Sequence, residues 1–244
     1  MAVRRQAEAL VFNPTPSVRV VPVGPERVCV VIDDALADPE ALVEWAAAQH
    51  FSPPQGYPYP GVVLDAPAEL ARHVGDCFAL HARGRLGARR TLGIAIRFSL
   101  VTTPPEELAP IQWQCHRDRL ATDPEQTLFA ASVLYLFRDP ALGGTSFYLP
   151  KLPPAETGRM VDDSHELDAT EFIARYGLSA GYMRGSNAYF DKVARVGAAW
   201  NRMICYDGGQ FHSADIDAAA GLDANPRSGR LTLNGFFTCR RNAA

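Results

Sequence analysis

The sequence has few of the features that mark secreted, membrane or zinc-binding proteins. Its 244 residues include five cysteines, an odd number, and no Cys-x-x-Cys pair occurs. This pattern excludes a disulfide framework and the usual spacing of a structural zinc site. The beginning of the chain has Arg4 and Arg5 but no apolar stretch after them, so no secretory signal is expected. The simplest localisation is therefore the cytoplasm.

Three further absences narrow the function. No run approaches the ~20 apolar residues of a membrane span, so we expect no membrane partner. The formal net charge of -3 does not indicate the basic surface that DNA- and RNA-binding proteins usually have, so no nucleic-acid partner is expected. There is no Gly-x-Ser-x-Gly elbow and no phosphate-binding glycine loop, which argues against serine hydrolases and P-loop enzymes.

The composition is that of an ordinary globular protein, with 47% hydrophobic and 21% charged residues. We expect a single domain over 1–244. Within it, residues 1–92 form an α/β support region and residues 93–240 form a β core. An insertion at about 153–200 interrupts this core, and we interpret its acidic stretch as a solvated loop followed by a short helix.

The support region begins with a buried strand over 27–33. Asp38 can cap a helix that starts at Pro39, and a second helix is expected over 66–80. Between these helices, four prolines exclude a regular helix from 52–61. The tyrosines of this loop either pack a connector or line a substrate mouth, and the sequence leaves both interpretations open.

From residue 93 onward, the sequence pattern is that of β-strands. Pro- and Gly-containing turns separate the candidate strands, and no helix of crossover length separates most neighbours, which favours an antiparallel sheet. About seven strands in one domain are typical of a sandwich, jelly roll or barrel. The candidate strands are 94–102, 111–118, 129–137, 145–149, 202–207, 211–216 and 230–240.

The segment 112–118 is the most informative part of the sequence. In an extended strand, its even-numbered side chains, among them His116 and Asp118, share one face, while Trp113 and Cys115 share the other. An imidazole and a carboxylate that converge there, joined by a second imidazole, make the facial ligand set of a non-haem Fe(II) oxygenase.

Two later segments can complete such a site. A buried strand and a glycine-containing turn lead to His212, whose neutral imidazole suits a divalent first-row metal. In the last strand Arg230 and Thr232 share one face. Because an inward arginine is costly unless it pairs with an anion, we expect its guanidinium to bind a carboxylate-bearing co-substrate.

The order of these motifs resembles that of the Fe(II)/2-oxoglutarate-dependent oxygenases. After His-x-Asp, His212 follows 94 residues later and Arg-x-Thr another 18 residues on. Within that superfamily the chain looks closest to uncharacterised bacterial proteins of prolyl-hydroxylase-like type, over about residues 93–240. The segment 143–147, Gly-Gly-Thr-Ser-Phe, is similar to the family's GG-x-x-F. Many such members have a lysine nearer the second histidine, whereas this chain has Arg230 further on, as other branches do.

The resemblance implies a mainly β fold, a double-stranded β-helix of the jelly-roll or cupin-like kind, with the N-terminal helices packed on the outside. His116, Asp118 and His212 would bind Fe(II). Arg230, assisted by Thr232, would hold 2-oxoglutarate as the co-substrate, and O₂ would be the oxidant. The implied activity is that of an oxidoreductase, a dioxygenase that hydroxylates a small molecule, an amino acid or a peptide side chain.

Several alternatives stay open. Tyr135 and Gln114 are interpreted as hydrogen-bond partners of the co-substrate or the metal ligands, but either could be an ordinary barrel side chain. A cupin-like binding protein without turnover would have the same fold, as would a metal-dependent isomerase or hydrolase that needs no 2-oxoglutarate. The prime substrate and the oligomeric state cannot be inferred from the sequence.

Overall fold

The computed structural model describes residues 11–118, 123–217 and 220–242, and this part of the chain is mainly β. A major sheet of seven strands has the order β1-β2-β8-β5-β10-β4-β3, and a minor sheet of three has the order β7-β6-β9. All the strand pairs in both sheets are antiparallel, as predicted. The strands are β1 Ser17–Gly24, β2 Arg27–Asp33, β3 Gly61–Asp65, β4 Ala88–Val101, β5 Thr127–Tyr135, β6 Thr145–Pro150, β7 Phe190–Val196, β8 Arg202–Asp207, β9 Phe211–Ala214 and β10 Arg230–Arg241.

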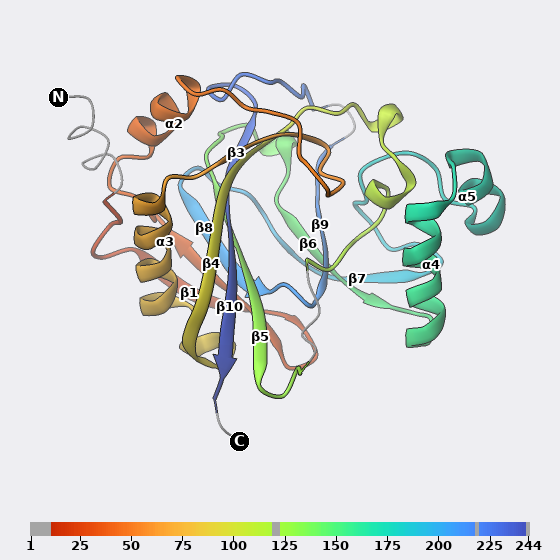
Figure 1. The fold of residues 1–244 in the computed structure, drawn as a ribbon, viewed down its shortest axis with the longest axis horizontal. Coiled ribbons are helices and arrows are strands. Elements are labelled where there is room, and N and C mark those ends of the chain that lie inside the picture. Colours follow the sequence, from red (N-terminus) through yellow and green to blue (C-terminus); the bar gives the residue numbers. More distant parts are fainter. Residues whose placement is uncertain (1–10, 119–122, 218–219, 243–244) are drawn as a thin grey trace.

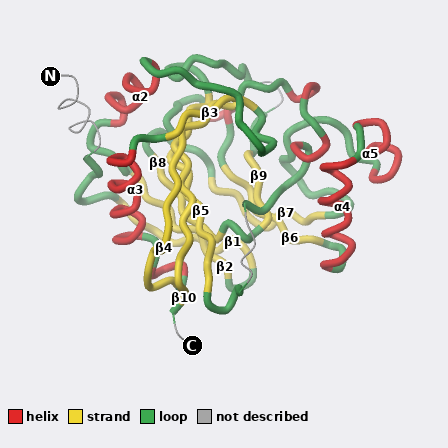
Figure 2. Tube along the Cα trace, in the orientation of Figure 1, coloured by secondary structure: helices red, strands yellow, loops and turns green. Residues whose placement is uncertain are grey.

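The elements are stacked in layers, with helices outside and the two sheets facing each other (Figure 1). Helices α2 (Pro39–Ala47) and α3 (Ala68–His81) lie beside the major sheet, and α4 (Pro154–Glu166) and α5 (Ala169–Tyr176) lie beyond the minor sheet. One apolar cluster joins the sheets, with Phe147 of the minor sheet packed near Ile204 and Tyr206 of the major sheet. The N-terminal helices are thus on the outside, as predicted (Figure 2).

Strand β10 shows why the two faces of the major sheet differ. Leu231, Leu233 and Phe237 point to the helices and belong to the same buried cluster as Phe78 of α3. The alternate residues Arg230 and Thr232 point to the minor sheet, as the period of two in a strand requires. The interior between the sheets therefore receives the polar residues of β10.

Local sequence patterns account for several elements. Strand β2 matches the predicted range, and α2 begins as predicted, because Asp38 Oδ1 accepts a hydrogen bond of 3.0 Å from the Ala41 N–H. Helix α5 begins with a capping box in which the Asp168 carboxylate accepts from the Glu171 N–H. The predicted short helix of the insertion is thereby confirmed.

Two predictions were wrong, and two strands were not predicted. The range 111–118 is not a strand: a 3₁₀ turn covers Pro110–Gln112, and residue 116 makes only an isolated bridge. The acidic stretch of the insertion is not a loop, since Asp162, Asp163 and Glu166 lie within α4, and the insertion also contains β7. Strands β1 and β3 were not predicted, because each is an edge strand whose extended form depends on pairing with a neighbour.

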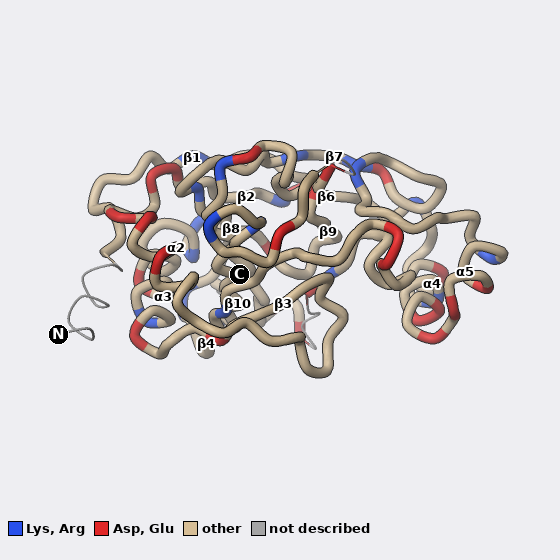
Figure 3. Tube along the Cα trace, turned by 90° about the horizontal axis from the view of Figure 1, so that it is seen from above, with Lys and Arg blue, Asp and Glu red and all other residues tan. Residues whose placement is uncertain are grey.

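Three further features concern the described chain as a whole. Among the described residues, none of the helices has the length and apolarity needed to cross a membrane. Basic and acidic positions are interspersed over the elements, as Figure 3 shows. All five cysteines are buried free thiols.

Candidate metal centre

The backbone places two histidines side by side. The His116 N–H donates to the His212 carbonyl and the His212 N–H donates to the His116 carbonyl, both at 2.9 Å. This pair is a single antiparallel bridge between the loop before residue 118 and strand β9. It brings the two imidazole rings to a centroid distance of 4.5 Å. The proximity that we attributed to a strand therefore comes from one pair of residues at the edge of the minor sheet.

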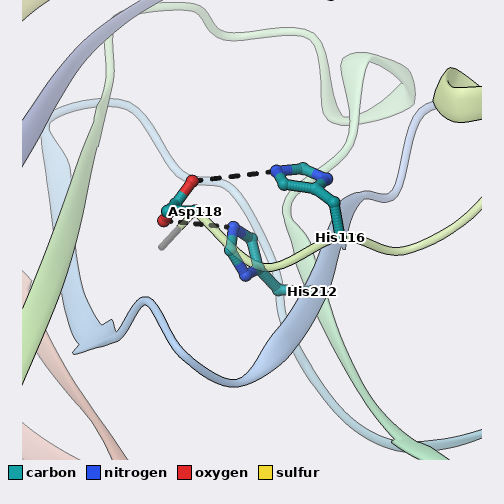
Figure 4. Close-up of side chains that lie close together, drawn as sticks. All are labelled: His116, Asp118 and His212. Atoms are coloured by element: carbon teal, nitrogen blue, oxygen red, sulfur yellow. Dashed lines mark ion pairs between the residues drawn. The ribbon is translucent and has the colours of Figure 1, made fainter. Parts of the chain in front are cut away.

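Asp118 completes a group of three side chains that point toward one another (Figure 4). One carboxylate oxygen lies 3.8 Å from His116 Nε2, and the other lies 3.5 Å from His212 Nε2. One ligand atom from each of the three residues lies within 4.8 Å of the others. Two imidazole nitrogens and one carboxylate oxygen at this spacing can coordinate one divalent metal ion.

The turn between β8 and β9 holds the carboxylate in place. The Asp118 N–H donates to the Gly208 carbonyl at 2.9 Å, which attaches the loop to this turn. A Cβ at position 208 would lie 3.0 Å from Asp118 Oδ2 and 3.2 Å from the Phe129 carbonyl oxygen. Glycine at position 208 is therefore what leaves room for the carboxylate.

His212 is oriented as a metal-binding histidine usually is. Its Nδ1 lies 2.9 Å from the Gln210 carbonyl oxygen, which can only accept, so Nδ1 carries the proton and Nε2 is free to bind a metal. The exposed fraction of the side chain is 6% for His212, 18% for Asp118 and 50% for His116. The group is thus closed on the side of His212 and open on the side of His116.

The three groups shift one another's pKa. Partial desolvation of the half-exposed ring, and then the charge of His212, lower the pKa of His116 to about 4. For Asp118, burial would raise the pKa of the carboxyl, but the two histidines outweigh it and the pKa is lowered. For His212, burial is opposed and outweighed by Asp118, so its pKa is raised. His116 is therefore neutral and Asp118 ionised at neutral pH.

Arg230 is buried on the inner face of β10 with no carboxylate in salt-bridge range among the described residues. Its Nε donates to the Leu142 carbonyl at 2.7 Å, and its Nη2 lies 3.4 Å from the carbonyl oxygens of Gly143 and Gly144. Its Nη1 has no hydrogen-bond partner in the described part of the chain. An inward arginine was predicted, and its neutralising anion is not supplied by these residues.

The glycine pair of the 143–147 segment allows the chain to approach this arginine closely. Gly143 has φ of 72°, and a Cβ there would lie 1.9 Å from the Asp215 carbonyl oxygen. A Cβ on Gly144 would lie 2.1 Å from the Val196 carbonyl oxygen. Neither position can hold a larger residue without moving the backbone that fixes the Arg230 guanidinium.

The other predicted residues divide into two groups. Thr232 and Tyr135 face each other across β10 and β5 on the inner face of the sheet. The Thr232 hydroxyl lies 3.4 Å from the Ser99 carbonyl oxygen, and the Tyr135 hydroxyl lies 2.8 Å from Thr145 Oγ1. Gln114 is buried outside any strand, and neither atom of its amide has a hydrogen-bond partner among the described residues.

Two further residues lie near the site: Tyr59, a tyrosine of the loop 52–61 whose role the sequence left open, and Arg97, which was not predicted. The Tyr59 hydroxyl is buried without a hydrogen-bond partner in the described part of the chain, and burial raises its pKa to about 12 against the opposing charge of Arg230. Arg97 of β4 adds to the lowering of the Asp118 pKa, so it too faces the site. The alternation of β4, with Ile96, Phe98 and Leu100 facing the helices, could have revealed an inward Arg97.

Comparison with known proteins places the chain as follows. Residues 14–237 match a family of unknown function, DUF6445. No curated protein sequence matches the chain. Among solved structures it is similar to a prolyl-4-hydroxylase of Pseudomonas putida, with 16% identity, a TM-score of 0.39, and 83% of this chain and 84% of that chain covered.

Two further solved structures show a comparable likeness. HygX of Streptomyces hygroscopicus, with nickel and 2-oxoglutarate bound, has 13% identity and a TM-score of 0.47, with 86% of this chain and 82% of that chain covered. EvdO2 of Micromonospora carbonacea var. aurantiaca has 15% identity and a TM-score of 0.48, with 94% of this chain and 96% of that chain covered.

Proposed function

We propose a function for this chain, which belongs to the DUF6445 family: it is an Fe(II)- and 2-oxoglutarate-dependent dioxygenase that hydroxylates its substrate. The observation that supports this most is the convergence of His116, Asp118 and His212 within 4.8 Å. We further propose that the two facing sheets form a double-stranded β-helix and that the chain acts as one domain in the cytoplasm.

The donor set fits Fe(II). Two imidazoles and one carboxylate are the 2-His-1-carboxylate ligands of non-haem iron oxygenases, which leave coordination positions open for a co-substrate and O₂. His116 is neutral and half-exposed, so it offers a lone pair toward the open side. The carbonyl of Gln210 fixes the tautomer of His212, as an outer hydrogen bond does in metal sites.

Arg230 fits one carboxylate of 2-oxoglutarate. Its guanidinium is fixed by backbone carbonyls and has no acidic partner among the described residues, so a bound dicarboxylate would supply the missing anion. The hydroxyls of Thr232 and Tyr135 lie on the same inner face and are candidates for hydrogen bonds to it. Gln114, buried with an unpaired amide, is the remaining candidate for a polar contact in the site.

When bound, the iron, 2-oxoglutarate and O₂ supply the oxidation, in which 2-oxoglutarate is converted to succinate and CO₂ and one oxygen atom enters a C–H bond of the substrate. The protein contributes position and environment. His116, Asp118 and His212 orient the metal, Arg230 anchors the co-substrate, and the apolar cluster around Phe147 and Tyr206 limits the access of water.

The test is an anaerobic titration of the purified protein with Fe(II) and 2-oxoglutarate, followed by the weak visible charge-transfer band of their chelate. We expect the band in the wild type, its loss in His116→Ala, and a higher 2-oxoglutarate requirement in Arg230→Met. His165→Ala, at an exposed position of α4, is the matched control and should behave as the wild type. A wild-type protein that gives no band would overturn the proposal.

A second measurement separates this function from a binding protein that shares the site. On admission of O₂, a dioxygenase forms succinate slowly even without its prime substrate, whereas a binding protein forms none. An isomerase or hydrolase on the same fold would need no 2-oxoglutarate, and Arg230→Met would leave its activity unchanged.

A further inference from the structure

Arg97 is a second inward-facing arginine that forms no ion pair with any residue in the described part of the chain. No hydrogen bond joins its guanidinium to any described residue, and its Nε is buried from solvent in that state. The facing residue on β3, Asp65, is exposed and forms no ion pair with it. An N–H of a guanidinium that is removed from water without a partner is costly, so the site favours a ligand that accepts from it.

Two aromatic rings hold the Arg97 guanidinium in a fixed place. Its central carbon lies 4.2 Å from the centroid of the Tyr57 ring and 4.5 Å from the centroid of the Phe236 ring. Tyr57 comes from the proline-rich loop 52–61, and Phe236 comes from the inner face of β10. Cation–π contacts with both rings preorganise the guanidinium, while no described residue accepts a hydrogen bond from it.

The register of the major sheet places this arginine beside the metal centre. Phe236 pairs with Ala131 of β5, and Ala131 pairs with Tyr206 of β8, so the three lie in one row across the sheet. The Tyr206 ring is 4.8 Å from the His212 ring. Since neighbouring strands are about 4.8 Å apart, the row from Phe236 to Tyr206 spans roughly 10 Å, which is the reach of a small substrate.

The formal charges of the metal, 2-oxoglutarate, Asp118, Arg230 and Arg97 leave one positive charge in excess, with Arg117 directed away over the Phe211 ring. The divalent ion and the dianionic 2-oxoglutarate cancel, and Asp118 cancels the charge of Arg230. Among these described groups, Arg97 is then the one whose charge has no counterpart, since Asp65 opposite it on β3 is exposed and forms no ion pair with it. A half-buried cation of this kind is most stable when the incoming ligand brings one negative charge.

We infer that Arg97 binds a carboxylate of the prime substrate and thereby selects a monoanionic substrate. This inference rests on the proposed function, because it assigns the anion to the substrate after 2-oxoglutarate has taken Arg230. The planar guanidinium matches the two oxygens of a carboxylate. The loop 52–61 contributes through Tyr57, which was one of the two interpretations left open by the sequence.

The test uses the full chain loaded with Zn(II), which is redox-inert and diamagnetic, and saturated with 2-oxoglutarate. The probes are N-acetylglycine and its uncharged match, N-acetylglycinamide. The readout is the arginine Nε–H resonances in ¹H–¹⁵N NMR spectra, assigned by their disappearance in Arg97→Lys and in Arg230→Lys. We expect the acid to move the Arg97 resonance in a saturable way and the amide to bind at least about tenfold more weakly.

Three results would overturn the inference: equal shifts with acid and amide, no shift with either, or saturation of the Arg97 resonance by 2-oxoglutarate alone. The last result would assign Arg97 to the co-substrate. Failure of the proposed function shows elsewhere, as a lack of response of the Arg230 resonance to 2-oxoglutarate. The two failures are therefore distinguishable in one series of spectra.

A turnover assay supplies a second readout. In the Fe(II) enzyme, we expect a panel of N-acetyl-L-amino acids with uncharged side chains to stimulate succinate formation more than the corresponding N-acetyl-L-amino acid amides. Arg97→Gln should abolish this preference, and Arg97→Lys should restore part of it. Arg90→Gln, an exposed arginine on the same strand, is the matched control and should keep the wild-type preference. A preference that survives in Arg97→Gln would contradict the inference.

Discussion

The two faces of strand β10 come from alternate residues of one segment, yet they have opposite character. On one face Leu231, Leu233 and Phe237 are buried among apolar residues, with the Phe237 ring stacked 3.9 Å from the Phe78 ring. On the other face Arg230 is buried without an acidic partner among the described residues. The comparison suggests a division of roles in which the helix side supplies stability and the inner side supplies binding. Substitutions on the two sides should then affect different measurements.

The largest change, a loss of metal affinity, is expected from a substitution between the two sheets. His212→Ala removes one of the three proposed ligands and leaves Asp118 without its nearest imidazole. We expect the affinity for Fe(II) or Zn(II) to fall at least about 100-fold, since loss of a ligand should cost more than loss of an outer hydrogen bond. Chelator competition measures the affinity. An affinity within twofold of the wild type would show that His212 is not a ligand.

The second prediction concerns stability and tests the face of β10 that packs against the helices. Phe237→Ala removes a fully buried stacked ring and should lower the free energy of unfolding by about 3–5 kcal/mol. Its neighbour Phe236 is partly exposed on the inner face, so Phe236→Ala should cost only about 1 kcal/mol. Urea denaturation measures both, and metal affinity should stay unchanged in Phe237→Ala. Equal costs for the two variants would contradict the division between the faces.

The sequence was most informative where a residue's role is set by local pattern. The alternation of 230–240 predicted which side chains of β10 point inward, and the buried runs of β2 and β8 predicted those strands. The cap at Asp38 predicted the start of α2. The sequence also singled out His116, Asp118 and His212, whose proximity the structure shows and whose role as ligands stays a prediction.

What the sequence could not provide depends on contacts between distant segments. The apparent alternation of 112–118 has another cause. Trp113 and Cys115 are buried in the cluster under α4 and α5, while the backbone is held by the bridge to His212 and by the hydrogen bond from Asp118 to Gly208. Arg97 was not predicted as a site residue, because its contacts with the rings of Tyr57 and Phe236 form only in the folded chain.

The pH dependence of metal binding is the third prediction. Because the pKa of His212 is raised above 6.5, a proton competes with the metal at this residue at a higher pH than at an ordinary histidine. Since His116 has a pKa of about 4, its ring remains unprotonated in this pH range and able to bind the metal. As the pH falls below the pKa of His212, the affinity for Zn(II) should drop about tenfold per pH unit, and more steeply only near pH 4. An initial drop of about hundredfold per unit would mean that both histidines titrate together.

The smallest change in metal affinity is expected at Gly208. This glycine lies outside β10, in the turn that holds Asp118 in place. In Gly208→Ala the added Cβ would lie 3.0 Å from Asp118 Oδ2 and 3.2 Å from the Phe129 carbonyl oxygen. Because the backbone carbonyl cannot easily move, the carboxylate should shift instead, and we expect metal affinity to fall by at most about tenfold, the lower end of the cost of an outer-shell change.

The matched control is Gly185→Ala, where a Cβ would meet no heavy atom within 4 Å. If Gly208→Ala lowers metal affinity while its free energy of unfolding stays close to that of the control, the turn between β8 and β9 acts on the site through Asp118. If it lowers only the free energy of unfolding, Asp118 adapts and the glycine serves packing. The first result would extend the separation of stability from binding beyond β10 to the loop that carries His116 and Asp118.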